Sequence, residues 1–183
     1  HGFDVAVHYR ASAADADATV RDARALGAQA AAFRADLSDE VACRALVPAV
    51  VAWRGRLDAV VNNASTFEYD DVSSFGYAAM DAHWRANTAP AIVLAQALHV
   101  HLGHAAAADP ATCSGCVVNL LDQKLWNPNP DYLSYTLSKA EDRLNHWFAP
   151  EDSSDPELDR GRTGADTPHN FVASATWDLP GDN

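Results

Sequence analysis

The feature that most constrains the fold is a regular alternation of short apolar segments with longer helical ones. Four segments have the length and composition of β-strands: residues 3–9, 29–34, 57–62 and 116–121. Each is followed by a helical pattern, at residues 12–27, 38–55, 86–102 and 133–147. Strands that alternate with helices pair in parallel, because each helix returns the chain to the start of the next strand. The sequence therefore predicts an α/β layered fold.

Local signals place the starts of two helices. Ser12 followed by Asp15 resembles a capping box and predicts a helix from that point. Ser38 is expected to cap the next helix, which ends at Gly55. Between residues 62 and 86 we expect a loop of roughly twenty residues. The following helix, 86–102, is apolar on nearly all sides, which indicates burial by its own domain or by a partner subunit.

Composition excludes several classes of partner. The 183 residues suit one domain with a sizeable core. A net charge of −12 argues against nucleic acid, whose phosphates it would repel. No apolar run is long enough to span a membrane, and three cysteines do not build a disulfide framework. The expected location is therefore a reducing cytoplasm.

The charge also divides the chain. Residues 151–183 hold eight acids and two arginines, are rich in Pro, Gly, Ser and Asp, and show no apolar period. Such a composition does not bury enough apolar surface to order a chain. We expect residues 1–148 to form a domain and residues 149–183 to form an acidic, irregular tail.

The strongest chemical signal lies at the fourth strand and its helix. Tyr135 and Lys139 stand four residues apart, so a helix brings them onto one face. The lysine charge lowers the pKa of the phenol from its ordinary value of about 10, which gives a proton donor usable near neutrality. Asp122 follows the strand 116–121, thirteen residues before Tyr135. Taken alone, a Tyr-x-x-x-Lys is more often a solvated helix face, so its surroundings decide.

Those surroundings are the segments that follow each predicted strand. They supply His8-Tyr9-Arg10, Asp36, Asn62-Asn63-Ala64-Ser65 and Asp122. In parallel sheets, ligands bind outside the carboxyl ends of the strands. We therefore predict a site for a small-molecule substrate along one edge of the sheet.

In this order and spacing, the motifs resemble the short-chain dehydrogenase/reductase family over residues 1–148. The matching residues are Asp36, Asn62-Asn63-Ala64, Asn87, Val117-Val118-Asn119 and Tyr135-x-x-x-Lys139. The resemblance implies a Rossmann-like doubly wound parallel sheet and hydride transfer with a nicotinamide cofactor. It also implies a homo-oligomer assembled through helices 86–102 and 133–148.

Asp122 points to a particular subgroup of that family, because most members have serine at the position thirteen residues before the tyrosine. With Asn63-Ala64-Ser65-Thr66-Phe67 and Tyr132, it is similar to the pteridine reductases. The resemblance implies that Asp122 and Tyr135 together protonate the pterin. A carboxyl group in a partly dry pocket has a raised pKa and can donate a proton to a ring nitrogen.

The resemblance also assigns the supporting roles. Lys139 would tune Tyr135 and hold the nicotinamide ribose, and Asn87 would order a water behind the lysine. The implied substrate contacts are Phe67, Trp126 and Tyr132, with Phe67 stacking on a flat heterocycle.

The segment after the first predicted strand favours NADPH over NADH. NAD enzymes generally place an acid after the second strand of the family sheet, the position that this segment matches, to bond the ribose 2′-hydroxyl. This chain has His8, Arg10 and Ser12 instead, and a cationic fork with a hydroxyl suits a 2′-phosphate. By resemblance, Asp36 lies near the adenine. The cofactor site is completed by Asn63, Ala64, Ser65 and Lys139.

One family feature is missing from the sequence. None of the nine glycines forms the Gly-rich turn that cradles a pyrophosphate. Because that turn follows the first strand of the family sheet, the segment 3–9 corresponds to its second strand, and a gap is expected beside the strand 57–62. The usual C-terminal segments are missing too, so we expect an incomplete sheet and a family fragment.

Three alternatives stay open. The chain could be an inert fragment or degenerate reductase that acts only in protein association, or its substrate could be a simple carbonyl. Cys113 and Cys116 with His101 and His104 could bind zinc, but their spacing is loose and the cysteines border a buried strand. We therefore predict no metal site.

Overall fold

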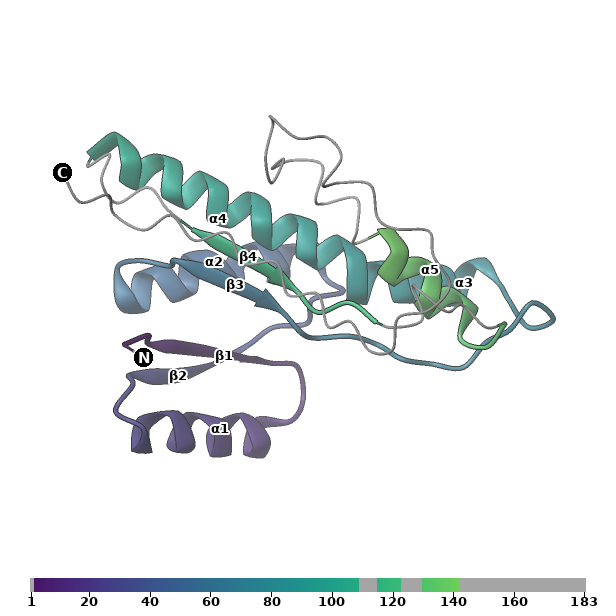
Figure 1. Cartoon of the computed structure of the whole chain (residues 1–183), viewed down its shortest axis with the longest axis horizontal. Helices are drawn as coiled ribbons and strands as arrows, with labels where there is room; N and C mark the ends of the chain where they lie inside the picture. The colour runs from purple at the N-terminus through teal and green to yellow at the C-terminus, as the bar shows by residue number, and fades with distance from the viewer. Residues whose placement is uncertain (1, 109–114, 123–129, 142–183) are drawn as a thin grey trace, which may run out of the picture.

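A computed structural model of the chain describes residues 2–108, 115–122 and 130–141. The tail predicted for residues 149–183 lies outside this described part. Strands and helices alternate as expected (Figure 1). The strands are β1 (Val5–Tyr9), β2 (Ala30–Arg34), β3 (Ala59–Asn62) and β4 (Cys116–Asn119). The helices are α1 (Ala13–Ala25), α2 (Glu40–Arg54), α3 (Tyr77–His83), α4 (Ala89–Ala108) and α5 (Leu133–Glu141), with a π-helix, η1 (Trp84–Thr88), between α3 and α4.

All strand pairing in the described part is parallel, which confirms the α/β class. β1 pairs with β2 from Val5 opposite Ala30 onward, and β3 pairs with β4 from Ala59 opposite Cys116 onward. The two pairs form separate two-stranded sheets within the described residues. The gap expected between the first and third predicted strands is therefore confirmed.

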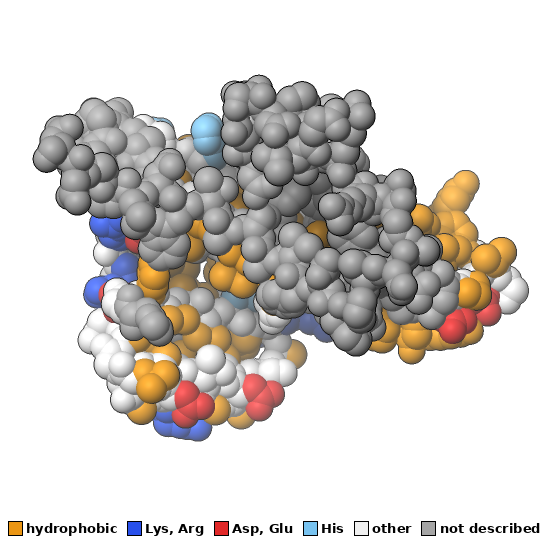
Figure 2. Space-filling model, viewed as in Figure 1, with side chains coloured by type: hydrophobic (Ala, Val, Ile, Leu, Met, Phe, Trp, Pro, Cys, Tyr) orange, Lys and Arg blue, Asp and Glu red, His pale blue; other side chains and the backbone are white. Residues whose placement is uncertain are grey.

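A cleft of about 1230 Å³ occupies this gap. Its walls include Val5 and Ala6 of β1 and Val60 and Val61 of β3. Val5 and Val61 remain 37% and 61% exposed, which is unusual for valines in strands of a parallel sheet. Figure 2 shows hydrophobic side chains where the part of the molecule that contains β1 and β2 faces the rest. The sheet is thus split along two strand edges.

The split divides the described part into two lobes. The first lobe, residues 3–39, consists of β1, α1 and β2, with α1 packed on both strands. The second lobe, residues 40–141, has its core where α2 meets α4 and β3, built on Cys43, Val47 and Leu94. An ion pair between Asp4 and Arg54 and an edge-to-face contact between Phe33 and Trp53, with ring centres 5.7 Å apart, join the lobes.

One of the two predicted helix caps is wrong, and the other is correct in position only. Ser12 stands at the start of α1, but its side chain makes no capping hydrogen bond. At α2 the cap is Asp39, whose carboxylate accepts the N–H of Val41 at 2.9 Å, and Ser38 instead bonds Asp36. A carboxylate one residue nearer to the helix competes better for the free N–H groups of the first turn.

The expected loop between residues 62 and 86 is wrong in its second half. α3 starts at Tyr77, and η1 connects it to α4 without a break. The long apolar helix predicted for 86–102 therefore begins at Ala89 and extends to Ala108. Short π-helical turns widen a helix locally and are frequent at functional sites. Here the wider turn contains Asn87 and Thr88, both buried.

Within the part of the chain that the structure describes, no helix combines the length and hydrophobicity required to span a bilayer.

Candidate active site

The predicted pair Asp122 and Tyr135 meets in the second lobe. The Tyr135 hydroxyl donates to Asp122 Oδ2 at 2.8 Å. Tyr135 is 6% exposed and Asp122 is half-buried, so this phenol–carboxyl bond is partly shielded from water. The pair joins the segment after β4 to the first turn of α5, across thirteen residues of sequence.

Lys139 lies one helical turn beyond Tyr135 and is 4% exposed. Its ammonium donates to the carbonyl of Leu120 at 3.2 Å, directly after β4. A lysine buried to this degree is held in place by its hydrogen bonds. All three predicted proton-transfer residues therefore gather at the carboxyl end of β4, where a parallel sheet places its ligands.

Asn87 binds the loop after β3 and helix α5 at the same time. Its amide oxygen accepts the N–H of Thr66 at 2.6 Å, and its amide nitrogen donates to the Thr66 carbonyl and to Ser138 Oγ, both at 3.0 Å. The side chain expected to order a water behind Lys139 is thus engaged with protein groups. What it does in this structure is fix the loop against the helix.

Next to Asn87, the hydroxyl of Thr88 donates to the Ser138 carbonyl at 2.7 Å, and Ser138 Oγ donates to the Tyr135 carbonyl at 2.7 Å. Thr88 is 1% exposed and Ser138 is fully buried. Sequence reasoning missed both residues. The sequence did contain a signal for Ser138. It lies between the candidate residues Tyr135 and Lys139, which share one helix face.

The predicted substrate contacts Phe67 and Tyr132 lie against each other. Their rings stack with centres 4.1 Å apart and planes 9° apart, and Phe67 meets the Tyr135 ring edge-on at 4.6 Å. Phe67 is 52% exposed. An aromatic surface therefore adjoins the Tyr135 ring, and such surfaces favour flat apolar rings. Trp126 lies outside the described residues.

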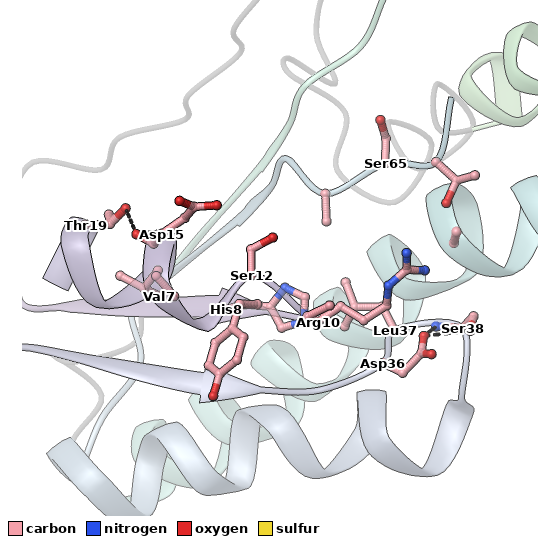
Figure 3. A pocket seen from close by; sticks show the side chains of 16 residues that line it. Val7, His8, Arg10, Ser12, Asp15, Thr19, Asp36, Leu37, Ser38 and Ser65 are labelled. Carbon is pink, nitrogen blue, oxygen red and sulfur yellow. Dashed lines mark hydrogen bonds between the residues drawn. The ribbon is translucent and has the colours of Figure 1, made fainter. Parts of the chain in front are cut away.

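The predicted cofactor residues of the first lobe line a separate pocket of about 430 Å³ (Figure 3). Arg10 and Ser12 follow β1, and Asp36 and Ser38 follow β2. Ser65, from the loop after β3, lies across the pocket and links it to the second lobe. Asp15 and Thr19 of α1 also line this pocket, and the sequence reasoning did not include them.

Two predicted cofactor residues are engaged with nearby groups. The His8 ring lies 2.9 Å from the carbonyl of Ala35. Hydrogen bonds from the Ser38 hydroxyl and N–H, aided by the charge of Arg10, hold the pKa of Asp36 below its ordinary value. Asp36 is therefore ionised near neutrality, and the turn it forms leads into α2.

The Asn-Asn-Ala motif lies between the two pockets. Asn62 donates to Asn119 Oδ1 at 2.7 Å, which ties the ends of β3 and β4 together. Asn63 lines the cleft between the sheets, whereas Ala64 borders both the cleft and the Arg10 pocket.

Among the described residues, no group of three or more His, Cys, Asp or Glu side chains is arranged to hold a metal ion. His101 instead accepts the N–H of Leu57 at 3.2 Å. Cys113, a member of the alternative zinc set, lies outside the described residues.

Comparison with known proteins gives a consistent result. The family model for short chain dehydrogenases matches residues 1–141. An uncharacterized oxidoreductase of Methylorubrum extorquens is 37% identical over 106 residues, which make up 56% of this chain and 41% of that protein.

Two solved structures are similar in both fold and sequence. FolM alternative dihydrofolate reductase 1 from Brucella canis, complexed with NADP, is 32% identical, with a TM-score of 0.70 over 82% of this chain and 60% of that one. A short chain dehydrogenase from Burkholderia cenocepacia, in complex with NADP, is 32% identical, with a TM-score of 0.66 over 79% of this chain and 55% of that one. The chain thus spans less than two thirds of the length of each of these relatives.

Proposed function

Because the chain belongs to the short-chain dehydrogenase family, we propose that it carries the proton-transfer site of an NADPH-dependent reductase acting on a pteridine-like ring. The observation that carries the proposal is the hydrogen bond between the Tyr135 hydroxyl and the Asp122 carboxylate. A phenol and a carboxyl group in contact can pass a proton between them and on to a substrate. The buried Lys139 lies one turn along the same helix.

The residues of the first lobe fit the 2′-phosphate end of NADPH. Arg10 and Ser12 are exposed and line one pocket, so a guanidinium and a hydroxyl are available to phosphate oxygens. Bound NADPH would supply a hydride. Lys139 and the Asn63-Ala64-Ser65 segment would hold its nicotinamide end between the lobes, by family resemblance. The solved relatives from Brucella canis and Burkholderia cenocepacia are both complexed with NADP.

The choice of a ring substrate rests on two features. Asp122 provides a carboxyl group where a serine hydroxyl would suffice for a simple ketone, and a ring nitrogen needs a group that can deliver a full proton. Phe67 and Tyr132 provide an aromatic surface beside Tyr135. The relative from Brucella canis is named an alternative dihydrofolate reductase, which is consistent with a fused-ring substrate.

The substrate proposal is tested with two variants at one position. Asp122→Ala removes the carboxyl group, and Asp122→Ser restores the hydroxyl that this family usually has. We expect each to lower the rate of NADPH-dependent reduction of a dihydropterin by about 100-fold, while Asp122→Ser retains reduction of an aliphatic ketone within about threefold. The absorbance of NADPH reports both reactions. Equal losses on both substrates would remove the pteridine assignment and leave a carbonyl reductase.

A fluorescence titration of the wild-type chain with NADPH separates a reductase from an inert member of the family. Saturable binding below about millimolar NADPH supports the proposal. Absence of binding favours a chain that acts only in protein association.

We further propose that the chain acts in a reducing cytoplasm, as a homo-oligomer assembled through α4 and α5. Cys43 and Cys116 are free thiols. Val100 of α4 and Leu137 of α5 are 54% and 42% exposed, which leaves apolar surface on both helices for a second copy. Sedimentation velocity of the wild-type chain tests the assembly.

A further inference from the structure

A buried carboxylate that the reaction does not use lies behind the first turn of α5. Asp70 belongs to the loop after β3 and is 4% exposed. Its carboxylate accepts the N–H of Ser134 at 3.0 Å (Oδ1) and 3.2 Å (Oδ2), and the Ser134 hydroxyl at 2.5 Å. The two residues are 64 positions apart in the sequence. Asp70 therefore acts as a helix cap supplied by a distant segment.

The main chain of Asp70 holds the residues just before Tyr135. Its carbonyl accepts the N–H of Tyr132 at 2.7 Å and the N–H of Leu133 at 3.3 Å. The first N–H groups of a helix have no partner within the helix, and a carboxylate near them is favoured by the helix dipole. Asp70 thus receives three successive N–H groups, two at its carbonyl and one at its carboxylate.

The chain needs this support, because Tyr132 has a φ of +57°. A bulky side chain rarely adopts that left-handed conformation, which persists only where surrounding contacts impose it. Tyr132 is held from two sides, by the Asp70 carbonyl at its N–H and by Phe67 stacked on its ring. Both contacts come from the loop after β3, so this loop determines where α5 begins.

We propose that Asp70 is a positioning residue for proton transfer, acting through Ser134 on the adjacent Tyr135. This inference rests on the function proposed above. The start of α5 sets the position of the Tyr135 hydroxyl, which bonds Asp122 at 2.8 Å. Loss of the Asp70 carboxylate frees the Ser134 N–H and hydroxyl inside the protein, and the first turn of α5 shifts to find other partners. Displacing a reacting group by about 1 Å can lower a rate by about 100-fold.

The chain offers a matched control in the next residue. Asp71 carries an identical carboxylate in the same loop, but it accepts hydrogen bonds from Ser73 and Ser74 within that loop. Asp70→Ala and Asp71→Ala therefore remove the same group from adjacent positions. Asp70→Asn is the conservative variant, because its amide oxygen still accepts the Ser134 N–H.

Steady-state kinetics with NADPH and a dihydropterin give the first readout. We expect Asp70→Ala to lower kcat about 10- to 100-fold with KM for NADPH within about twofold. Asp70→Asn should recover part of that loss, and Asp71→Ala should change neither constant. A purely structural role would lower the melting temperature of Asp70→Ala and leave kcat of the folded protein intact, which would overturn the proposal. If Asp70→Ala does not fold, Asp70→Asn and Ser134→Ala take its place.

Amide hydrogen exchange over residues 132–136 gives the second readout, and it does not depend on activity. We expect exchange to be at least about tenfold faster in Asp70→Ala and unchanged in Asp71→Ala. Equal protection in both variants would overturn the proposal. A wild-type chain that reduces neither a dihydropterin nor a ketone would refute the proposed function, while exchange would still decide whether Asp70 fixes Tyr135.

Discussion

The two lobes hold their polar side chains in opposite ways. In the first lobe, Arg10, Ser12 and Asp36 are exposed around an open pocket. In the second lobe, Asn87 is 4% exposed and Thr88 1%, and Ser138 is fully buried. Asn87 and Thr88 both donate hydrogen bonds to Ser138, and Asn87 also bonds Thr66, so the three form one continuous network.

The two halves of the proposed site therefore respond differently to the loss of a polar group. Buried polar groups in a satisfied network are costly to disturb, because any member that loses its partner has no water to replace it. Exposed groups exchange a protein partner for water at little cost. The proton-transfer side is therefore organised without a ligand. The exposed groups on the cofactor side contribute little to the stability of the protein, and we expect their charges to act mainly on a bound ligand.

Removal of the reacting hydroxyl in the second lobe should lower activity most. Tyr135→Phe removes one hydroxyl, and we expect it to lower kcat for NADPH-dependent reduction about 1000-fold, within the range for loss of a general acid. Steady-state rates measure the change. Tyr132→Phe makes the same chemical change three residues earlier and should cost less than about tenfold. Similar losses in the two variants would show that Tyr135 has no special role.

A matched pair of threonines tests the comparison of the lobes directly. The Thr88 hydroxyl donates to the Ser138 carbonyl in the buried network, and the Thr19 hydroxyl donates to the Asp15 carbonyl on an exposed face of α1. We expect Thr88→Val to lower the free energy of unfolding by about 1–3 kcal/mol, because a buried carbonyl loses its partner. Thr19→Val should change it by less than about 0.5 kcal/mol. Urea unfolding measures both.

If the two substitutions destabilise the protein equally, burial does not increase the cost of losing a hydrogen bond. The proposed difference between the lobes would then be wrong.

The smallest expected effect lies in the first lobe. Arg10→Ala should lower the preference for NADPH over NADH about tenfold, because a charge-assisted contact to the 2′-phosphate is lost. The ratio of kcat/KM for the two cofactors measures this preference. Arg21→Ala removes the same charge from the exposed face of α1, away from the pocket, and should leave the ratio unchanged. Both variants should unfold like the wild type, and an unchanged ratio in Arg10→Ala would place the phosphate elsewhere.

Much of the fold was accessible from periodicity and turn residues. The four strands and the helices α1, α2, α4 and α5 are found close to their predicted ranges, because strand and helix patterns are local properties of the chain. The cap of α2 was mispredicted because Ser38 and Asp39 both have side chains able to cap, and only backbone geometry selects one of them. The π-helix that presents Asn87 has no distinct sequence pattern.

The α/β order of elements and the positions of Asp122, Tyr135 and Lys139 near one strand end could be inferred from the amino-acid pattern alone. Those features follow from spacing along one helix and one strand. That Asn87 bonds Thr66 and Ser138, and that Asp70 caps α5, became apparent only in the folded structure. Each of these contacts joins groups 21 to 64 residues apart, at distances where about 0.5 Å separates a hydrogen bond from none. No local pattern encodes such a fit, because it results from the packing of whole elements.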